Sequence, residues 1–329
     1  MEGMARILII GGGGMVGQKL ARLLDQTPID QAGDTITLFD RSFPSDGASA
    51  NTLVTGDVVD VKAMQTLLSS RFDVIFHLAS VVSGEAEADF RVGYDTNLTG
   101  FWNFLSHLEA EHTASDGNYR PRVFFTSSIA VFGPPFPVKI GDDFPVAPQT
   151  SYGAQKAVSE LLVADLDRRG IIEGLAIRLP TICVRPGRAN LAASSFFSGI
   201  IREPLNGEEA ILPVPTSVRH WHASPRSAAG FLRHAGTLDL ARRRSRAALN
   251  LPGVSCTVEE QIEALRDVAG NKAVALIRSV PDETIMRIVS TWPRDFDPVE
   301  ALSLGFRAET SFREIIEHYI QDDLTDRSL

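Results

Sequence analysis

The sequence has few cysteines, no excess of positive charge and no long apolar run, and each lack excludes a class of protein. Its two cysteines, Cys183 and Cys256, provide neither a disulfide framework nor a cysteine-rich metal cluster. Asp and Glu outnumber Lys and Arg by 41 to 32, and the net charge of −9 argues against a nucleic-acid partner or an anionic membrane. The apolar runs are too short to cross a bilayer. We therefore expect a cytoplasmic protein with no nucleic-acid or membrane partner.

The chain of 329 residues contains short apolar runs that alternate with helical patterns from residue 5 to about 180. This alternation predicts an α/β fold, a doubly wound Rossmann architecture in which helices cover both faces of a parallel sheet. The expected strands are 5–10, 35–39, 53–55, 73–79, 122–127 and 174–179, and the expected helices are 15–25, 60–70, 85–112 and 152–168.

The composition changes after Pro180, where the chain becomes rich in Pro, Gly, Arg and Ser. A helix expected at 226–239 and a short strand at 248–251 can return to the sheet, and a further strand is expected at 273–278. We predict two domains with a discontinuous boundary: a Rossmann domain of residues 1–182 plus about 226–253, and a smaller α/β substrate lobe of residues 183–225 and 254–329.

A glycine-rich loop follows the first apolar run, Ala5–Ile10, and leads into a helical pattern. Glycines lack a Cβ, so the backbone can approach a pyrophosphate at the N-terminus of a helix. The next apolar run ends in Asp40, near the position where a carboxylate accepts hydrogen bonds from the adenosine ribose. This order of strand, loop, helix, strand and acid predicts a dinucleotide site. The loop residues expected at the cofactor are Gly11, Gly14, Met15, Val16 and Gly17.

A second motif, Tyr152-x-x-x-Lys156, opens the helical pattern of residues 152–168. The two side chains are i and i+4 on one face of this helix, with Cβ atoms about 5–6 Å apart. A nearby ammonium favours the phenolate and lowers the pKa of a tyrosine from its usual value of about 10. Tyr152 is therefore predicted to take a proton from a hydroxyl near neutral pH.

Together these motifs resemble those of the extended short-chain dehydrogenases/reductases, over nearly the whole chain. The shared motifs include the glycine loop, Gly56-Asp57-Val58, His77-Leu78-Ala79-Ser80, Asn97-Leu98-Thr99-Gly100, Thr126-Ser127-Ser128 and the Tyr152–Lys156 pair. The resemblance implies an enzyme with NAD as its cofactor and Ser128, Tyr152 and Lys156 as its catalytic residues. It also implies that the cofactor contacts Asp57, Val58, Leu78, Ala79, Ser80, Asn97, Tyr152, Lys156, Pro180 and Ile182.

The choice between NAD and NADP depends on two neighbouring residues. Asp40 favours NAD, because its charge repels the 2′-phosphate of NADP. Arg41 can accommodate that phosphate, so NADP stays open as an alternative.

The substrate lobe resembles a branch of the family that oxidises a four-carbon sugar acid at the C2 hydroxyl with NAD. The resembling segments are Arg178–Gly187, Ser194–Gly207 and Val218–His222. Independently of this resemblance, Arg185, Arg188 and Arg219 occur in the lobe expected to face the nicotinamide, and a forked guanidinium suits a carboxylate. These arginines and Ser128 are the predicted substrate-binding residues.

A nucleotide-sugar 4-epimerase with tightly bound NAD is the main alternative, because it uses the same fold. Arg188, Asn190 and Arg219 keep diphosphate binding open. The R-x-x-x-H-V-x-D stretch of many nucleotide-sugar enzymes is replaced here by Arg219–Arg226, with a shorter spacing and no Asp, which favours the dehydrogenase. A non-catalytic NAD sensor is disfavoured, because the chain keeps both Tyr152 and Lys156.

Metal binding and self-association are the remaining questions. His220 and His222 have the spacing to share a strand face, but no third ligand lies nearby, so no metal site is predicted. The helical patterns of residues 85–112 and 152–168 resemble the pair that forms a four-helix dimer interface in the family, which implies a homodimer.

Overall fold

The computed structural model describes residues 4–30, 33–45, 52–187 and 193–324. The chain divides into two compact units: the first consists of Met1–Ser128, Thr150–Arg178 and Ala229–Leu249, and the second of Ile129–Gln149, Leu179–Ala228 and Asn250–Leu329. Residues 129–149, which the sequence pattern assigns to the Rossmann domain, belong to the second unit.

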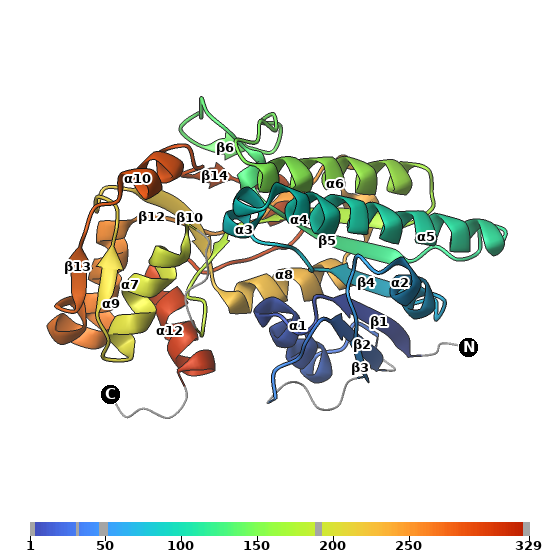
Figure 1. Cartoon of the computed structure of the whole chain (residues 1–329), viewed down its shortest axis with the longest axis horizontal. Helices are drawn as coiled ribbons and strands as arrows, with labels where there is room; N and C mark the ends of the chain where they lie inside the picture. Colours follow the sequence, from blue (N-terminus) through green and yellow to red (C-terminus); the bar gives the residue numbers. More distant parts are fainter. Residues whose placement is uncertain (1–3, 31–32, 46–51, 188–192, 325–329) are drawn as a thin grey trace. The chain divides into compact units, whose positions relative to one another are not determined.

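A seven-stranded sheet with the order β11-β7-β5-β4-β1-β2-β3 forms the centre of the first unit (Figure 1). The pairs β1–β2, β2–β3, β1–β4 and β4–β5 are parallel. The order reverses between β1 and β4, and open α/β sheets bind ligands at such a switch point. The predicted doubly wound α/β fold is thereby confirmed. The strands are β1 (Ala5–Ile10), β2 (Asp34–Asp40), β3 (Thr52–Thr55), β4 (Val74–His77), β5 (Arg122–Ser128), β7 (Glu173–Leu179) and β11 (Leu249–Asn250).

Helices cover both faces of this sheet (Figure 1). Apolar side chains of β1, β4 and β5 pack against α2, α5 and α6 on one face. On the other face, a Cβ added at Gly236 of α8 would come within 3.2 Å of the Phe76 ring of β4. The helices are α1 (Met15–Gln26), α2 (Val61–Leu68), α3 (Ser83–Ala88), α4 (Phe90–Tyr94), a π-helical turn η1 (Asp95–Gly100), α5 (Phe101–Ala114), α6 (Ser151–Arg168), α8 (Pro225–Thr237) and a 3₁₀ turn η3 (Leu240–Arg242).

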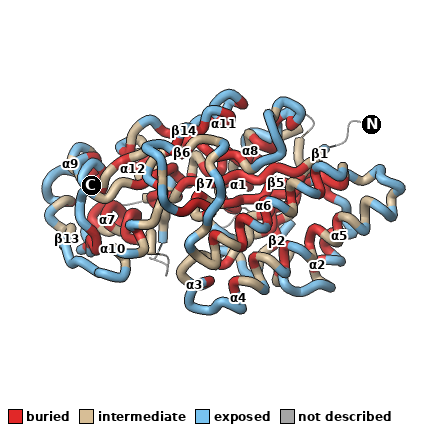
Figure 2. Tube along the Cα trace, turned by 90° about the horizontal axis from the view of Figure 1, so that it is seen from above, coloured by how far each residue is buried: buried red, intermediate tan, exposed pale blue. Residues whose placement is uncertain are grey.

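The central strands are apolar without interruption because both of their faces are covered. Residues Ile7 to Ile10 of β1 are fully buried, and Figure 2 shows the central strands in the buried colour. Alternating apolar and polar residues are typical of sheets with one solvent-exposed face, whereas a continuous apolar run is typical of parallel strands between two helical layers.

The second unit contains three small sheets, with the orders β12-β10-β8, β13-β9 and β14-β6. Phe197 and Ile200 of α7, Leu265 of α9 and Ile315 of α12 belong to its apolar core. The strands are β6 (Ile140–Gly141), β8 (Thr181–Ile182), β9 (Ala210–Leu212), β10 (Arg219–Ala223), β12 (Val254–Thr257), β13 (Ile277–Ser279) and β14 (Phe296–Asp297). The helices are a 3₁₀ turn η2 (Ile129–Val131), α7 (Ser195–Leu205), α9 (Val258–Val274), α10 (Glu283–Ser290), α11 (Val299–Ser303) and α12 (Phe312–Asp323).

Two expected elements need correction. The strand expected at 273–278 is mostly wrong: α9 extends to Val274, and the strand covers only Ile277–Ser279. An apolar run at the end of a helix and a short buried strand have the same local pattern. The single helix expected at 85–112 is divided, because Asp89 accepts hydrogen bonds from the N–H groups of Arg91 and Val92 and thereby starts a new helix. No helix of the described part of the chain is long and apolar enough to span a membrane.

Candidate functional site

The glycine loop joins β1 to α1 and approaches two other parts of the first unit very closely. Gly11 has a φ of +88°, and a Cβ added there would lie 2.6 Å from the backbone nitrogen of Ala79. A Cβ at Gly17 would lie 2.4 Å from the carbonyl oxygen of Gly11. Larger residues at these two positions would push the loop away from the β4 end and α1 away from the loop.

At Gly14, neither the backbone conformation nor a close contact within the protein requires a glycine. Its backbone is extended, and the only described atom within 4 Å of an added Cβ, apart from chain neighbours, is the Gly11 carbonyl oxygen at 3.4 Å. Gly14 lines a cleft and precedes α1, whose first turn has no acidic residue and no side-chain cap. The missing Cβ therefore leaves room toward the cleft, where N–H groups at a helix N-terminus favour an anion. These features fit the pyrophosphate of a dinucleotide.

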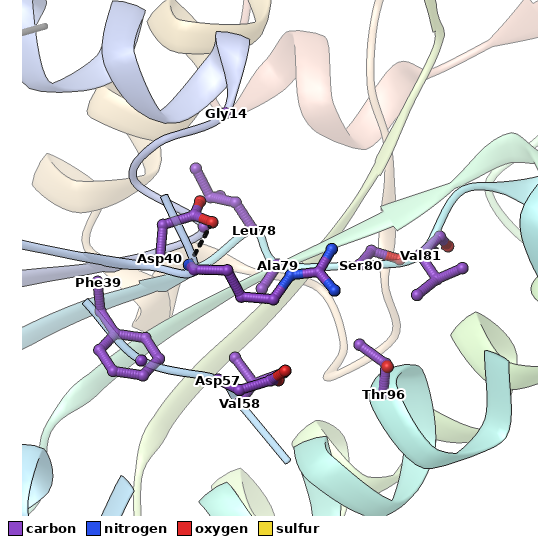
Figure 3. Close-up of a pocket in the computed structure, with 13 residues that line it drawn as sticks. Gly14, Phe39, Asp40, Asp57, Val58, Leu78, Ala79, Ser80, Val81 and Thr96 are labelled. Atoms are coloured by element: carbon purple, nitrogen blue, oxygen red, sulfur yellow. Dashed lines mark hydrogen bonds between the residues drawn. The ribbon is translucent and has the colours of Figure 1, made fainter. Parts of the chain in front are cut away.

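Asp40 follows the buried part of β2 and lines the same cleft (Figure 3). Its Oδ2 accepts a hydrogen bond from the Gly13 N–H at 2.9 Å, and its Oδ1 accepts one from the Arg41 N–H at 2.7 Å. The two bonds fix the orientation of the carboxylate. Each oxygen keeps acceptor capacity for a further donor, which fits a pair of ribose hydroxyls.

The carboxyl ends of β1, β2 and β4 meet at one edge of the sheet, because Ile10 pairs with Phe39 and with His77. The segments beyond these ends build the walls of the cleft, which holds about 170 Å³ of water-accessible space. Of the predicted cofactor residues, the cleft brings together Gly11, Gly14, Asp40, Asp57, Val58, Leu78, Ala79 and Ser80. It also contains Phe39, Arg41, Gly56, Val81 and Thr96, which were not among them.

The other predicted cofactor residues of the first unit lie around this cleft. Met15 and Val16 begin α1, directly after Gly14. Asn97 is buried in the π-helical turn, where its Oδ1 accepts hydrogen bonds from the Val81 N–H at 2.8 Å and from Ser80 Oγ at 3.0 Å. Its hydrogen bonds therefore hold Ser80 and Val81, two residues of the cleft wall, in place.

Tyr152 and Lys156 lie in the first turns of α6. This helix begins at Ser151 because Thr150 caps it, with the Thr150 hydroxyl accepting from the Gly153 N–H at 3.0 Å. Lys156 is buried, and its Nζ donates to the Thr126 carbonyl oxygen at 2.8 Å. Burial lowers the pKa of Lys156 to about 7, and the carboxylate of Glu160 opposes this shift.

Ser128 is the last residue of β5, two residues beyond the carbonyl that accepts from Lys156. Its neighbour Ser127 is buried and donates to Glu160 of α6 at 2.5 Å. Arg178 of β7 binds both oxygens of Glu160, with Nε at 2.9 Å and Nη2 at 2.8 Å. This buried pair ties α6 to two strands of the sheet beside the Lys156 turn.

The predicted substrate arginines belong to the second unit. Arg219 of β10 donates to the Ser255 carbonyl oxygen at 3.0 Å and forms an ion pair with Glu260 at 3.2 Å. The Nε of Arg185 donates to the carbonyl oxygen of Ile182, at the end of β8, at 3.0 Å. Pro180 precedes β8, and Arg188 lies outside the described residues.

Two buried histidines lie side by side on β10, with ring centres 5.2 Å apart. The Nδ1 of His220 is 2.8 Å from the Pro293 carbonyl oxygen, which can only accept, so this nitrogen carries the proton. Burial lowers the pKa of His220 to about 4 and holds that of His222 well below its usual value. The described residues contain no group of three or more His, Cys, Asp or Glu side chains that could hold a metal.

Comparison with known proteins was made for the sequence and for the structure. Residues 7–224 match the model of the NAD dependent epimerase/dehydratase family. The chain is 42% identical to D-erythronate dehydrogenase of Cupriavidus necator, over 96% of this chain and 98% of that protein. It is 38% identical to D-erythronate dehydrogenase of Haemophilus influenzae, over 97% and 100%. A solved structure described as a nucleoside-diphosphate-sugar epimerase from Agrobacterium tumefaciens superposes with a TM-score of 0.92, at 51% identity, over 98% of this chain and 95% of that one.

Proposed function

Since the chain belongs to the NAD-dependent epimerase/dehydratase family, we propose that it is a dehydrogenase that oxidises the C2 hydroxyl of D-erythronate, a four-carbon sugar acid. The observation that carries this proposal is the likeness, over nearly the full length of both chains, to two proteins named D-erythronate dehydrogenase. Family membership makes the chain an NAD-dependent enzyme, and the cleft at the β1/β4 switch point fits the dinucleotide. The substrate, the oxidised carbon and the catalytic residues are our proposals.

In the proposed reaction, Tyr152 acts as the general base that removes the proton of the C2 hydroxyl. Lys156, one turn along α6, supplies the positive charge that favours the Tyr152 phenolate. Ser128 hydrogen-bonds the same substrate oxygen and stabilises it as the C–O single bond becomes a carbonyl. The nicotinamide ring, when bound, accepts the hydride that leaves C2. The products are a 2-keto acid, NADH and one proton.

Recognition of the acid requires a cation for its carboxylate. Arg185 and Arg219 of the second unit, together with Arg188, are the candidates, because a planar guanidinium binds a carboxylate through two parallel hydrogen bonds. The ion pair of Arg219 with Glu260 does not disqualify it: 38% of the Arg219 side chain and 53% of the Glu260 side chain are exposed, and such pairs are weak.

The experiment that tests this proposal is the absorbance of NADH after purified protein is mixed with NAD and a panel of four-carbon sugar acids. The panel includes D-erythronate and its stereoisomers, and a parallel series contains NADP. We expect NADH in excess of the enzyme with D-erythronate and NAD. NADH formation only with another acid would overturn the substrate, and faster reduction of NADP would overturn the role of Asp40 in cofactor choice.

A nucleotide-sugar 4-epimerase is the second candidate, and the description of the 51% identical structure favours it. An epimerase passes hydride to NAD and back, so it releases no net NADH. Interconversion of UDP-sugars by the same preparation, without NADH release from any acid, would establish this function instead.

We also propose that the protein forms a homodimer through α5 and α6, which pack side by side (Figure 1). Apolar side chains on these helices are exposed in the single chain, among them Trp102 at 49% and Leu161 at 68%. A helix face of this kind is typical of an interface. Light scattering of the wild type and of Leu161→Glu tests the proposal: we expect a dimer and a monomer, respectively, and a monomeric wild type would overturn it.

A further inference from the structure

The wall of the cofactor cleft is held by one buried amide. Asn97 accepts hydrogen bonds from the Val81 N–H and from Ser80 Oγ, and its Nδ2 donates to the Val81 carbonyl oxygen at 3.1 Å. Because a backbone N–H can only donate, the Asn97 oxygen must face Val81, and the orientation of the amide is fixed. Both residues that Asn97 holds line the cleft.

The second hydrogen of Asn97 Nδ2 is directed toward α6. It is donated to the Oε1 of Gln155 at 2.7 Å. Gln155 is fully buried and lies between Tyr152 and Lys156 in sequence, so its backbone belongs to the same turns of α6. A continuous chain of hydrogen bonds therefore runs from the cleft wall through Asn97 to the helix that carries the proposed general base.

The Gln155 side-chain amide forms a hydrogen bond only through its oxygen, within the described part of the chain. Its Nε2 is buried and has no hydrogen-bond partner among the described residues. Gly93 of α4 makes room for it, since a Cβ added at Gly93 would lie 2.9 Å from Nε2. A buried donor without an acceptor destabilises a fold, and an apolar side chain of similar length would avoid this cost. What glutamine adds at this position is the acceptor oxygen that meets Asn97.

We propose that Gln155 is a positioning residue that couples the cofactor cleft to α6. By fixing the Asn97 amide, it keeps Ser80 and Val81 in the arrangement that receives the dinucleotide. Without the bond to Gln155, the Asn97 amide keeps its three bonds to Ser80 and Val81 but has a buried N–H with no acceptor. The amide is then held less firmly, and the cleft wall must be ordered at the expense of cofactor affinity. This inference rests on the NAD cleft of the proposed function and is independent of its substrate.

The decisive variant is Gln155→Met, which keeps the length of the side chain and removes both polar atoms. Calorimetric titration of the protein with NAD, in the absence of any substrate, should give a dissociation constant about tenfold higher than that of the wild type. The melting temperature of the cofactor-free protein should change little, because the unpartnered Gln155 donor is removed while one Asn97 N–H loses its acceptor. A purely structural role would instead lower the melting temperature and leave NAD affinity unchanged, and that result would overturn the proposal.

Ser159→Ala is the matched control on the same helix. Ser159 is buried and donates to the Gln155 carbonyl oxygen at 2.9 Å, but it contacts only the backbone of Asn97, at 3.5 Å. We expect its NAD affinity to equal that of the wild type. A loss as large as that of Gln155→Met would show that any change in this helix weakens binding, and the proposal would fail.

Two further variants test the connection itself. Gln155→Glu keeps an acceptor oxygen toward Asn97, so NAD affinity within about threefold of the wild type is expected, whether or not the methionine variant folds. A tenfold loss of NAD affinity in this variant would contradict the inference.

Ser80→Ala removes another bond to the same Asn97 amide, and its effect on NAD affinity should be non-additive with that of Gln155→Met. If the wild type itself fails to bind NAD, the proposed cofactor cleft is wrong and the inference falls with it.

Discussion

The Nζ nitrogen of Lys156 lies 5.6 Å from the centre of the Tyr152 ring, one turn further along α6. The same nitrogen lies 4.6 Å from the centre of the Phe125 ring and donates to the Thr126 carbonyl oxygen, so both partners come from β5. The lysine is thereby fixed in a buried position beside the tyrosine. A cation in that position stabilises the phenolate, which is the form that accepts a proton.

Replacing Tyr152 by phenylalanine should therefore stop turnover while leaving cofactor binding largely intact. The variant loses only the phenolic oxygen, and the cleft that fits NAD is lined by other residues. We expect kcat to fall at least about a thousandfold, as for removal of a general base, with an NAD dissociation constant close to that of the wild type. NADH formation and calorimetric titration measure the two quantities. Turnover that survives the substitution would assign the base to another residue.

The charge of Lys156 should set the alkaline limit of activity. Burial lowers its pKa to about 7, and Glu160, one turn further along α6, raises it. Glu160→Gln removes this negative charge, so the pKa of Lys156 should fall further and the alkaline limb of the kcat/KM profile should move to lower pH. At about pH 8 we expect a loss of roughly tenfold relative to the wild type.

The control for Glu160 is Glu111→Gln on α5. Glu111 also forms an ion pair, with Arg71 at 2.9 Å, but both partners are at least partly exposed. Its substitution should leave the pH profile unchanged. An alkaline limb that does not move in Glu160→Gln would mean that the buried Glu160–Arg178 pair only ties α6 to the sheet.

Arg219→Ala should raise the KM of the acid substrate about tenfold or more and change kcat little, if Arg219 binds the carboxylate. Glu260→Gln separates this role from a structural one, because it breaks the same ion pair and leaves the guanidinium in place. We expect a wild-type or lower KM in that variant. Equal increases in the two variants would show that only the ion pair matters, and an unchanged KM in Arg219→Ala would leave Arg185 and Arg188 as candidates.

Local patterns were sufficient to predict much of the first unit. Strand β1 was predicted with its observed ends, Ala5 and Ile10, because a strand covered on both faces is apolar throughout. The residues gathered at the cleft follow directly after such strands, as Gly11 follows β1 and Asp40 ends β2. A motif placed at the end of a parallel strand has its position in space determined by the sheet.

Relationships between distant residues were not accessible in this way. Gln155 meets Asn97 across 58 residues, and no spacing within either motif indicates the contact. Arg219 meets Glu260 across 41 residues, so its ion pair was equally hidden. The division of the segment 85–112 depends on Asp89, which can cap a helix or extend a helical pattern with the same neighbours.

Three buried histidines should make the folded protein sensitive to acid. Burial lowers the pKa of His77 to about 3 and that of His220 to about 4, and it holds that of His222 well below 6.5. At a pH between these folded-state pKa values and about 6.5, each of these histidines is protonated in the unfolded chain and neutral in the folded protein. The free energy of unfolding should therefore fall as the pH decreases below about 6.5, by up to about 1.4 kcal/mol per pH unit for each histidine.

His77 is the site at which this prediction is easiest to isolate. Neither of its ring nitrogens has a hydrogen-bond partner among the described residues, and its ring centre lies 4.8 Å from that of Phe101 and 5.1 Å from that of Phe104. The positive charge of Lys156 also lowers the pKa of His77, after burial. His77→Phe places an aromatic ring that cannot be protonated among these rings. Urea unfolding of both proteins at about pH 7 and pH 5 gives the change in the free energy of unfolding between the two pH values. Contributions from titratable groups that both proteins share cancel in the comparison. We expect the free energy of unfolding to fall by about 2 kcal/mol less in the variant than in the wild type between the two pH values. Equal decreases would mean that His77 is neutral at about pH 5 in the unfolded chain, or protonated in the folded protein.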